Sequence, residues 1–382
     1  MPTATIDAVE LTRDLIRRPS VTPADAGAMD IVEATLGGLG FACRRMRFGQ
    51  IENLYARYGT AGPNLCFAGH TDVVPVGDAG AWSKDAFAAD VVDGVLIGRG
   101  SVDMKSAIAA FAAAAAEAIA AGRVTGSISF LITGDEEGVA TDGTTKVVDA
   151  LRAEGEIIDH CVVGEPTSAE TFGDMVKVGR RGSINAEIVV EGIQGHVAYP
   201  HRAANPAPVL IRLLAALQAR RLDEGYPEFQ PSNLEVTWID VPNTATNVIP
   251  GVARARLNIR FNPNHTGQQL ADWFNVEATK AAEGFPGKIT VIPAISGEAF
   301  LTERGAFTDL VAAAVADVTG AAPELSTSGG TSDARFIRAL CPVIEVGLVG
   351  KTMHQVDERA PVDEIRRLQQ VYARIIARYF AQ

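Results

Sequence analysis

Residues 104–121 read MKSAIAAFAAAAAEAIAA and predict one long helix, because alanine has the highest helix propensity of all residues. Phe111 and Ile119 are interspersed among the alanines. Short apolar runs of β type lie before and after this stretch, near residues 53–57, 64–68, 127–133 and 160–163. Strands that alternate with helices are typical of α/β proteins. We therefore expect an α/β sandwich with a mixed central sheet.

The pattern changes after Gly182, where strands and helices are predicted in the order β-α-β-β-α-β. The predicted strands are NAEIVVEG, NLEVTWIDV, VARARLNIRF and KITVIPA, and the helices lie near residues 208–220 and 267–282. This order is that of a ferredoxin-like α+β unit. We expect residues 182–294 to be an inserted domain, and the flanks, residues 1–181 and 295–382, to form one catalytic domain.

Composition excludes several classes of protein. A chain of 382 residues exceeds what one hydrophobic core usually supports, so about two domains are expected. It has no run of about 20 apolar residues, and its first residues lack a secretory signal, so we expect a cytoplasmic protein. Four scattered cysteines are interpreted as buried thiols. The net charge of -12 argues against nucleic-acid binding and is interpreted as favouring solubility.

Five short motifs end a strand or a turn on a side chain that can bind metal. They are FAGHTDVVP with His70 and Asp72, GRGSVDMK with Asp103, ITGDEEG with Glu136 and Glu137, VVGEPT with Glu165, and GKTMHQVDE with His354. In α/β sheets, ligands bind in the crevice beyond the carboxyl ends of the strands. Two imidazoles and several carboxylates suit a pair of divalent metals that share a bridging carboxylate.

Each motif alone also has a purely structural interpretation. Asp72 could cap a turn beside a partly buried His70, or it could take the second imidazole N–H of His70 and fix its tautomer. Asp103 could be the N-cap of the long helix, or it could bridge two cations. The acids of ITGDEEG could form a solvated turn. Acids crowded in this way repel one another, which a metal would relieve, so Glu137 is predicted as a ligand and Glu136 as a general base.

The motifs together resemble those of the co-catalytic dizinc amidohydrolases and exopeptidases, a family that includes aminoacylases, carboxypeptidases and acetylornithine deacetylase. The similarity extends from RPSVTP near the start to MHQVDE near the end. Within this family, four segments are similar to those of the bacterial desuccinylases that act on N-succinyl-LL-2,6-diaminopimelate. These segments are DGT after the acidic turn, RRGS, GIQGHVAYPH and STSGGTSDARF.

The resemblance implies a role for each ligand. Asp103 would bridge two zinc ions, for which cobalt or manganese could substitute. His70 and Glu165 would complete one site, and Glu137 and His354 the other.

Catalytic roles are implied in the same way. Asp72 would orient His70, and Glu136 would take a proton from the attacking water and pass it to the departing amine. His196 would stabilise the negative charge on the carbonyl oxygen and would come from the partner subunit of a homodimer that forms through the inserted domain.

The implied substrate, N-succinyl-LL-2,6-diaminopimelate, carries three carboxylates and would yield succinate and LL-2,6-diaminopimelate for lysine and cell-wall synthesis. Arginine and hydroxyl or amide donors suit such a substrate. The positions that match substrate-binding residues of the family are Arg180, Ser183, Tyr199, Asn247, Arg260 and Thr327. One position departs from the pattern, because Gly350 stands where many relatives have asparagine four residues before the last metal-binding histidine.

Two alternatives remain at this point. The chain could be an acetylornithine deacetylase or a related exopeptidase, which would use the same metal ligands. It could also be a non-catalytic binding protein on the same scaffold, although such a protein would be expected to lack a ligand or the base.

Overall fold

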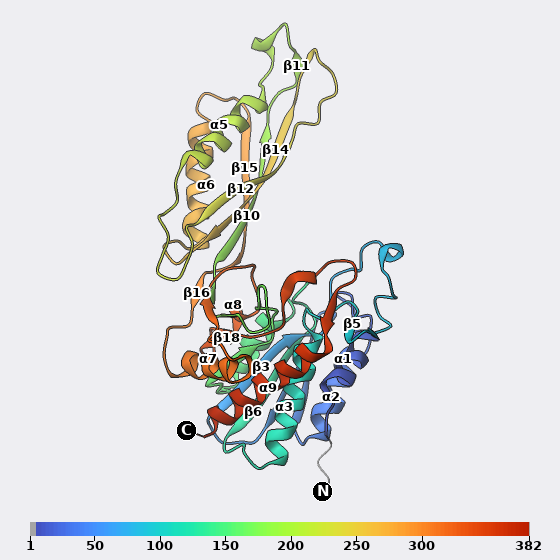
Figure 1. Cartoon of the computed structure of the whole chain (residues 1–382). Helices are drawn as coiled ribbons and strands as arrows, with labels where there is room; N and C mark the ends of the chain where they lie inside the picture. Colours follow the sequence, from blue (N-terminus) through green and yellow to red (C-terminus); the bar gives the residue numbers. More distant parts are fainter. Residues whose placement is uncertain (1–4, 382) are drawn as a thin grey trace. The chain divides into compact units, whose positions relative to one another are not determined.

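The computed structural model describes residues 5–381, and the chain divides into two compact units (Figure 1). The first unit contains the described residues up to Gly179, then Thr302–Ser326, and those from Ser332 onward. The second contains Arg180–Leu301 and Thr327–Thr331. Segments from both ends of the chain therefore build the first unit. Among the described residues, no helix is both long and apolar enough to cross a membrane.

A mixed eight-stranded sheet forms the centre of the first unit, with the strand order β1-β2-β6-β3-β7-β18-β8-β17. The strands are β1 (Ala42–Phe48), β2 (Ile51–Tyr58), β6 (Ser127–Thr133), β3 (Asn64–His70), β7 (His160–Val163), β18 (Val343–Glu345), β8 (Met175–Lys177) and β17 (Glu324–Ser326). β3 runs parallel to β6 and β7, whereas β2 is antiparallel to β1 and β6. The predicted mixed central sheet is confirmed.

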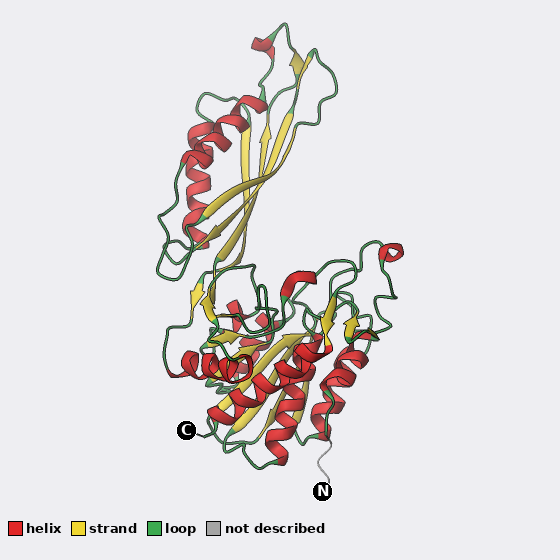
Figure 2. Cartoon of the chain, viewed as in Figure 1, coloured by secondary structure: helices red, strands yellow, loops and turns green. Residues whose placement is uncertain are grey.

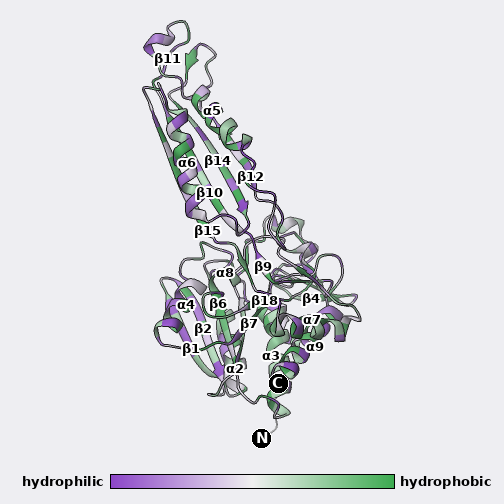
Figure 3. Ribbon diagram, turned by 90° about the vertical axis from the view of Figure 1, so that its left-hand side faces the viewer, coloured by the Kyte–Doolittle hydropathy of each residue, from purple (hydrophilic) through white to green (hydrophobic). Residues whose placement is uncertain are grey.

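Helices accompany this sheet in the first unit (Figure 2). They are α1 (Ala8–Ile16), α2 (Ala28–Gly38), α3 (Lys105–Ala120), α4 (Thr144–Ala153), α7 (Ala306–Thr319), α8 (Ala334–Ile337) and α9 (Val362–Tyr379). The predicted alanine-rich helix is α3, which is coloured mainly as hydrophobic in Figure 3 and is buried along nearly all of its length. Small alanine side chains let α3 pack closely against α1, α9 and the sheet.

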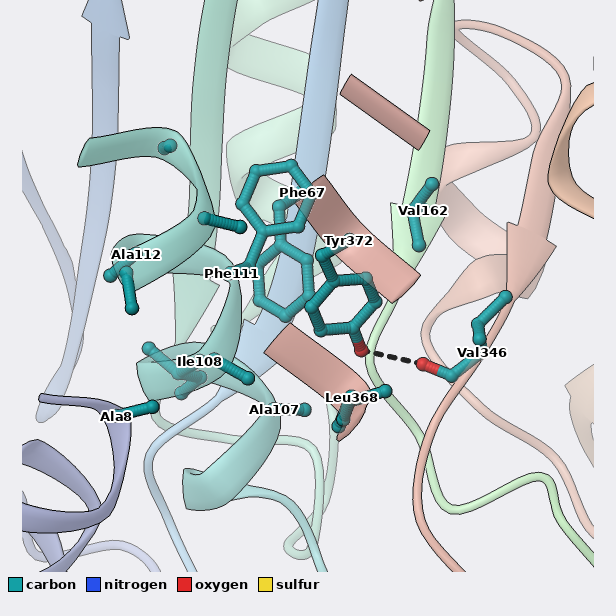
Figure 4. Close-up of a cluster of buried hydrophobic side chains, with 14 of the residues drawn as sticks. Ala8, Phe67, Ala107, Ile108, Phe111, Ala112, Val162, Val346, Leu368 and Tyr372 are labelled. Carbon is teal, nitrogen blue, oxygen red and sulfur yellow. Dashed lines mark hydrogen bonds between the residues drawn. The ribbon is translucent and has the colours of Figure 1, made fainter. Parts of the chain in front are cut away.

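Aromatic rings join α3, α9 and the sheet in the core shown in Figure 4. Phe67 of β3 and Phe111 of α3 stack with ring centroids 4.6 Å apart, and the ring of Tyr372 from α9 lies 5.3 Å from that of Phe111. The Tyr372 hydroxyl donates a 2.6 Å hydrogen bond to the carbonyl oxygen of Val346. This bond satisfies a polar group that would be costly to bury unpaired. The core therefore holds β3, whose end carries His70, firmly in place.

A small sheet in the first unit joins two distant parts of the chain. It has the order β19-β5-β4, with β19 at Arg359–Pro361, β5 at Val95–Ile97 and β4 at Asp90–Val92. Two short 3₁₀ helices, η1 (Ala79–Ala81) and η3 (Gly350–Thr352), lie in the adjoining loops. The pairing of β5 with β19 keeps the segments that carry Asp103 and His354 together, although about 250 residues separate them in the chain.

The second unit is an antiparallel four-stranded sheet with two helices on one face (Figure 2). The strand order is β12-β14-β10-β15, with bounds Asn233–Asp240, Val252–Phe261, Gly182–Glu191 and Lys288–Gly297. The helices are α5 (Pro206–Ala219) and α6 (Gly267–Ala281). Along the chain the main elements follow the predicted β-α-β-β-α-β order, so this part of the predicted fold class is confirmed.

Alternation along β10 explains the packing of the second unit. Ile184, Ala186, Ile188 and Val190 are buried against the helices, whereas the intervening residues are more exposed. Since successive residues of a strand point to opposite faces, only one face of this sheet is covered. The remaining short elements are β9 (Gly179–Arg180), β11 (Gly195–His196), η2 (Pro200–Arg202), β13 (Val248–Ile249) and β16 (Phe300–Leu301).

Candidate metal centre

Three neighbouring parallel strands deliver candidate ligands to one edge of the central sheet. His70 is the last residue of β3, Glu136 and Glu137 follow β6, and Glu165 follows β7. The carboxyl ends of β6, β3 and β7 lie side by side because the three strands are parallel and adjacent. This is the edge at which ligands bind in α/β sheets.

Asp103 lies between two imidazoles. Its Oδ1 is 3.1 Å from Nε2 of His70, and its Oδ2 is 3.3 Å from Nε2 of His354. Glu165 Oε1 is 3.7 Å from the same nitrogen of His70, and Glu137 Oε1 is 2.9 Å from that of His354. Each oxygen of Asp103 therefore belongs to a separate group of one imidazole and one further carboxylate. Within each group the potential ligand atoms lie within 4.8 Å of one another.

The structure excludes the simplest alternative for Asp103. α3 begins at Lys105, and the N-cap position is occupied by Met104, whose side chain makes no capping hydrogen bond. Asp103 is therefore not the N-cap of α3, and its carboxylate is directed at the two histidines instead.

The carboxylates of the centre are perturbed by burial and by one another. Burial raises the pKa of Glu165 well above its usual range, and the charges of Asp103 and Glu136 add to the rise. Burial also raises the pKa of Glu136, to which the charges of Asp333 and Glu137 contribute. Buried carboxylates in such proximity need a positive charge nearby if they are to stay ionised.

The two imidazoles carry positive charge when they are protonated. Hydrogen bonds to Asp103 and Glu137 raise the pKa of His354 to about 10. Burial alone would lower the pKa of His70, but Asp103 and Glu165 raise it well above its usual value. Divalent cations could replace these protons. Nitrogen and oxygen donors at this spacing are those that zinc and similar metals prefer, so the residues fit a metal pair.

Asp72 supports the centre in a way that differs from the predicted one. The Nδ1 of His70 lies 2.9 Å from the main-chain carbonyl oxygen of Asp72 and 3.6 Å from its carboxylate. The carboxylate instead accepts hydrogen bonds from the backbone N–H groups of Glu136, at 3.2 Å, and Glu137, at 3.0 Å. Asp72 therefore contacts His70 through the main chain and holds the acidic turn through its side chain. Burial raises the pKa of Asp72 to about 6.

Glu136 lies next to the centre. Its carboxylate belongs, with Glu137 and His70, to a further group of potential ligand atoms within 4.8 Å of one another. Its backbone is fixed by Asp72, and its raised pKa brings proton exchange closer to neutral pH. These are the properties expected of a general base.

Three predicted residues lie together in the second unit, beyond the end of β10. His196 of β11 pairs with Val248 of β13, and its ring centroid is 5.6 Å from that of Tyr199. The carbonyl oxygen of Asn247 accepts a 3.0 Å hydrogen bond from the backbone N–H of Val197. His196 and Tyr199 are exposed. These side chains are available to a ligand or to another chain.

The other predicted substrate-binding residues lie near the opposite end of β10. Ser183 is near the start of this strand and pairs with Arg260 of β14. Arg180 is buried, with its Nη1 3.3 Å from the carbonyl oxygen of Gly330. Thr327 donates a hydrogen bond to the carbonyl oxygen of Glu228. Ser183 and His196 are thus separated by most of a ten-residue strand, a span of about 30 Å.

Two buried charged residues beside the centre were not predicted. Arg99 and Glu358 form a 2.7 Å ion pair and are almost fully buried. Both lie inside the quoted motifs, GRGSVDMK and GKTMHQVDE, but nothing in the sequence shows that the two motifs meet. The signal that could have identified them is a charged residue that lies within a metal-binding motif but has no assigned role as a ligand.

The sequence of this chain matches a known peptidase family. The profile of Peptidase family M20/M25/M40 matches residues 66–378, and the chain is a member of that family. The M20 family metallo-carboxypeptidase from Sulfolobus solfataricus has a similar fold, with a TM-score of 0.82 and 16% identity over 98% of this chain and 100% of that one.

Relatives of much higher identity carry a more specific name. The chain is 88% identical over 378 residues to succinyl-diaminopimelate desuccinylase of Phenylobacterium zucineum. The aligned region covers 99% of this chain and 100% of the relative. It is 71% identical to the protein of the same name from Caulobacter vibrioides, over 98% of this chain and 97% of the relative. The predicted resemblance to the desuccinylases is confirmed.

Proposed function

We propose that this chain hydrolyses N-succinyl-LL-2,6-diaminopimelate to succinate and LL-2,6-diaminopimelate. The observation that carries the proposal is the position of Asp103, each of whose oxygens faces a separate imidazole and carboxylate. The substrate is proposed from the named relatives, which match 99% and 98% of the chain. The reaction would serve lysine and diaminopimelate synthesis in the cytoplasm.

Two zinc ions are the proposed cofactors, with cobalt as a possible substitute. Asp103 would bridge them, His70 and Glu165 would complete one site, and Glu137 and His354 the other. When bound, such a pair of ions activates water and polarises an amide carbonyl group. The raised pKa values of His70 and His354 mean that both imidazoles must release a proton before they can bind a metal.

Glu136 is proposed as the proton shuttle. Its carboxylate would take a proton from the attacking water as the water oxygen bonds to the amide carbon. It would then give the proton to the nitrogen as the carbon–nitrogen bond breaks and the amine leaves. The support is its position beside His70 and Glu137 and its elevated pKa. Asp72 would hold both the turn that carries Glu136 and the ring of His70.

Residues 182–294, which form most of the second unit, are proposed as an inserted dimerisation and lid domain. The strongest support is the strand of about 30 Å that separates His196 from Ser183 and Arg260, since groups so far apart in one chain cannot bind one small molecule together. Residues from two chains could do so. Arg180, Ser183, Arg260 and Thr327 would bind carboxylates of the substrate, while the second copy would contribute His196, Tyr199 and Asn247.

An apolar groove suggests where the two copies meet. It lies between α5 and the edge strand β12 and is lined by residues that include Ile211, Val236, Trp238 and Ile239. Ile211 is 66% exposed and Ile239 is 58% exposed, which is unusual for isoleucine. An edge strand with apolar neighbours is a ready site for pairing with another chain.

A comparison of two substrates tests the proposal. The purified full-length chain, supplied with zinc, should cleave N-succinyl-LL-2,6-diaminopimelate much faster than N-acetylornithine. Faster cleavage of acetylornithine would favour the related deacetylase instead. Absence of cleavage of either substrate, with two zinc ions bound per chain, would support a non-catalytic binding protein.

A further inference from the structure

Glu358 is a buried carboxylate that contacts the backbone directly before the central metal-ligand candidate. It is fully buried, and its Oε1 accepts three hydrogen bonds from one turn. The donors are the backbone N–H groups of Gly100 at 3.1 Å, Val102 at 2.9 Å and Asp103 at 3.1 Å. Since one of these donors belongs to Asp103 itself, Glu358 determines where the Asp103 backbone lies.

Arg99 extends this contact to the other side of the centre. Its Nη1 donates a 2.7 Å hydrogen bond to Oε2 of Glu358, and its Nη2 lies 3.4 Å from the carbonyl oxygen of His354. The guanidinium also lies over the ring of Trp82, 5.3 Å from its centroid. Arg99 can therefore hold the backbone of His354 and the carboxylate of Glu358 at the same time.

The backbone of His354 needs such support. His354 has a φ of 62°, in the left-handed region that costs energy for residues other than glycine, and its side chain is 46% exposed. In contrast, His70 is the last residue of a buried strand and is itself buried. The sheet fixes His70, whereas His354 lies on a loop and depends on local contacts.

We propose that the Arg99–Glu358 pair is a positioning pair that sets the separation of Asp103 and His354 and so the affinity for the ion between them. The inference rests on the proposed metal centre. Groups that orient metal ligands commonly change metal affinity or activity by about 10- to 100-fold when they are replaced. The ion held by Glu137 and His354 should be affected more than the ion held by His70 and Glu165.

Zinc titration of the metal-free full-length chain by calorimetry tests the proposal. His354→Ala and His70→Ala variants first assign the two binding steps to the two sites. Glu358→Gln, which keeps the shape but removes the charge, should weaken the His354 step about 10- to 100-fold and leave the other step nearly unchanged. Excess zinc should restore kcat in this variant without a change in KM.

A matched control uses another ion pair of the same unit. Arg57 and Glu156 pair at the opposite end of the parallel strands, before β7 begins, and both side chains are 22% exposed. Glu156→Gln should leave both zinc-binding steps unchanged. If Glu358→Gln binds zinc like the wild type, the proposal is wrong. It is also wrong if both steps weaken equally while the metal-free protein melts at a lower temperature, because Glu358 would then be a general stabiliser.

A second variant keeps the test decisive if Glu358→Gln does not fold. Arg99→Lys retains a positive charge opposite Glu358 but cannot span both Glu358 and the carbonyl oxygen of His354. It should weaken the same zinc-binding step, and wild-type affinity would refute the proposal. If the wild-type chain itself fails to bind two zinc ions, the proposed metal centre is refuted, which is a different result from wild-type affinity in the variants.

Discussion

The metal centre and the segment that carries His196 and Tyr199 differ in how the fold presents them. His70 and Glu165 are buried at the ends of packed strands, where the sheet determines their positions, and Asp103 is buried in the turn before α3. His196 and Tyr199 are exposed, on short elements of the second unit. These buried ligand candidates thus lie on a rigid scaffold inside one chain. His196 and Tyr199 are separated along β10 from Ser183 and Arg260, and a second copy of the chain is proposed to bring these groups together.

The largest expected effect is on the chemistry of the buried region. Glu136→Ala should lower kcat by about 10²- to 10⁴-fold, because the general base is removed. Zinc content, measured by mass spectrometry, should stay at two ions per chain because Glu136 is not a proposed ligand. Turnover close to that of the wild type would rule out this role for Glu136.

The exposed region gives the next largest effect. His196→Ala should lower kcat by about 10²- to 10³-fold, as expected for loss of one donor to the developing negative charge. Mixing this variant with Glu136→Ala should restore about a quarter of wild-type activity, since half of the random dimers would have one complete site. If the mixed sample stays inactive although its chains exchange, His196 does not act between subunits.

A third prediction concerns the edge strand β12, where the two copies are proposed to meet. Ile239→Asp should shift the chain from dimer to monomer in sedimentation, because a charge would be buried at the proposed interface. The activity should fall as the dimer dissociates, while the zinc content is retained. Ile292→Asp is the matched control, since Ile292 is 54% exposed on β15, at the opposite edge of the sheet. A dimer that survives Ile239→Asp but not the control variant would place the interface elsewhere.

Proton competition gives a smaller, pH-dependent effect at the metal centre. The pKa of His354 rises from an ordinary 6.5 to about 10, so its protonated form stabilises the metal-free fold fully below pH 6.5, and this stabilisation is lost as the pH rises toward 10. Zinc affinity should change in the opposite direction and rise over the same window, because zinc displaces the proton. Calorimetry in buffers of different ionisation enthalpy would measure the proton release. A zinc affinity that does not depend on pH in this window would contradict the role of His354 as a metal ligand.

The smallest effect is expected at Gly350. Its φ lies outside the left-handed region, and a Cβ there would be 3.5 Å from the sulfur of Met353 and 3.6 Å from Pro166, which is ordinary contact. Gly350→Asn should therefore fold with a stability change within about 0.5 kcal/mol. KM for the succinylated substrate should fall if the amide contacts it. A large loss of stability on thermal melting would show that the glycine is structurally required.

Local pattern predicted many of the elements, but not the contacts between them. The alanine-rich run predicted α3, and the run NAEIVVEG predicted the strand β10. The sequence did not reveal that the carboxylate of Asp72 would hold the turn after β6 while its carbonyl oxygen contacts His70. That choice depends on which donors meet in space, which spacing along the chain cannot show.

The sequence by itself determined the fold class and which residues are available as ligands, because helix propensity, strand alternation and strand-end acids are local properties. Only the tertiary structure decided how those residues are oriented. It directs one oxygen of Asp103 to each histidine, and it places Glu358 against the turn that ends in Asp103. The contacts of Asp103 with His354 and Glu358 join segments about 250 residues apart. They arise from burial and from the antiparallel pairing of β5 with β19, which act only once the chain has folded.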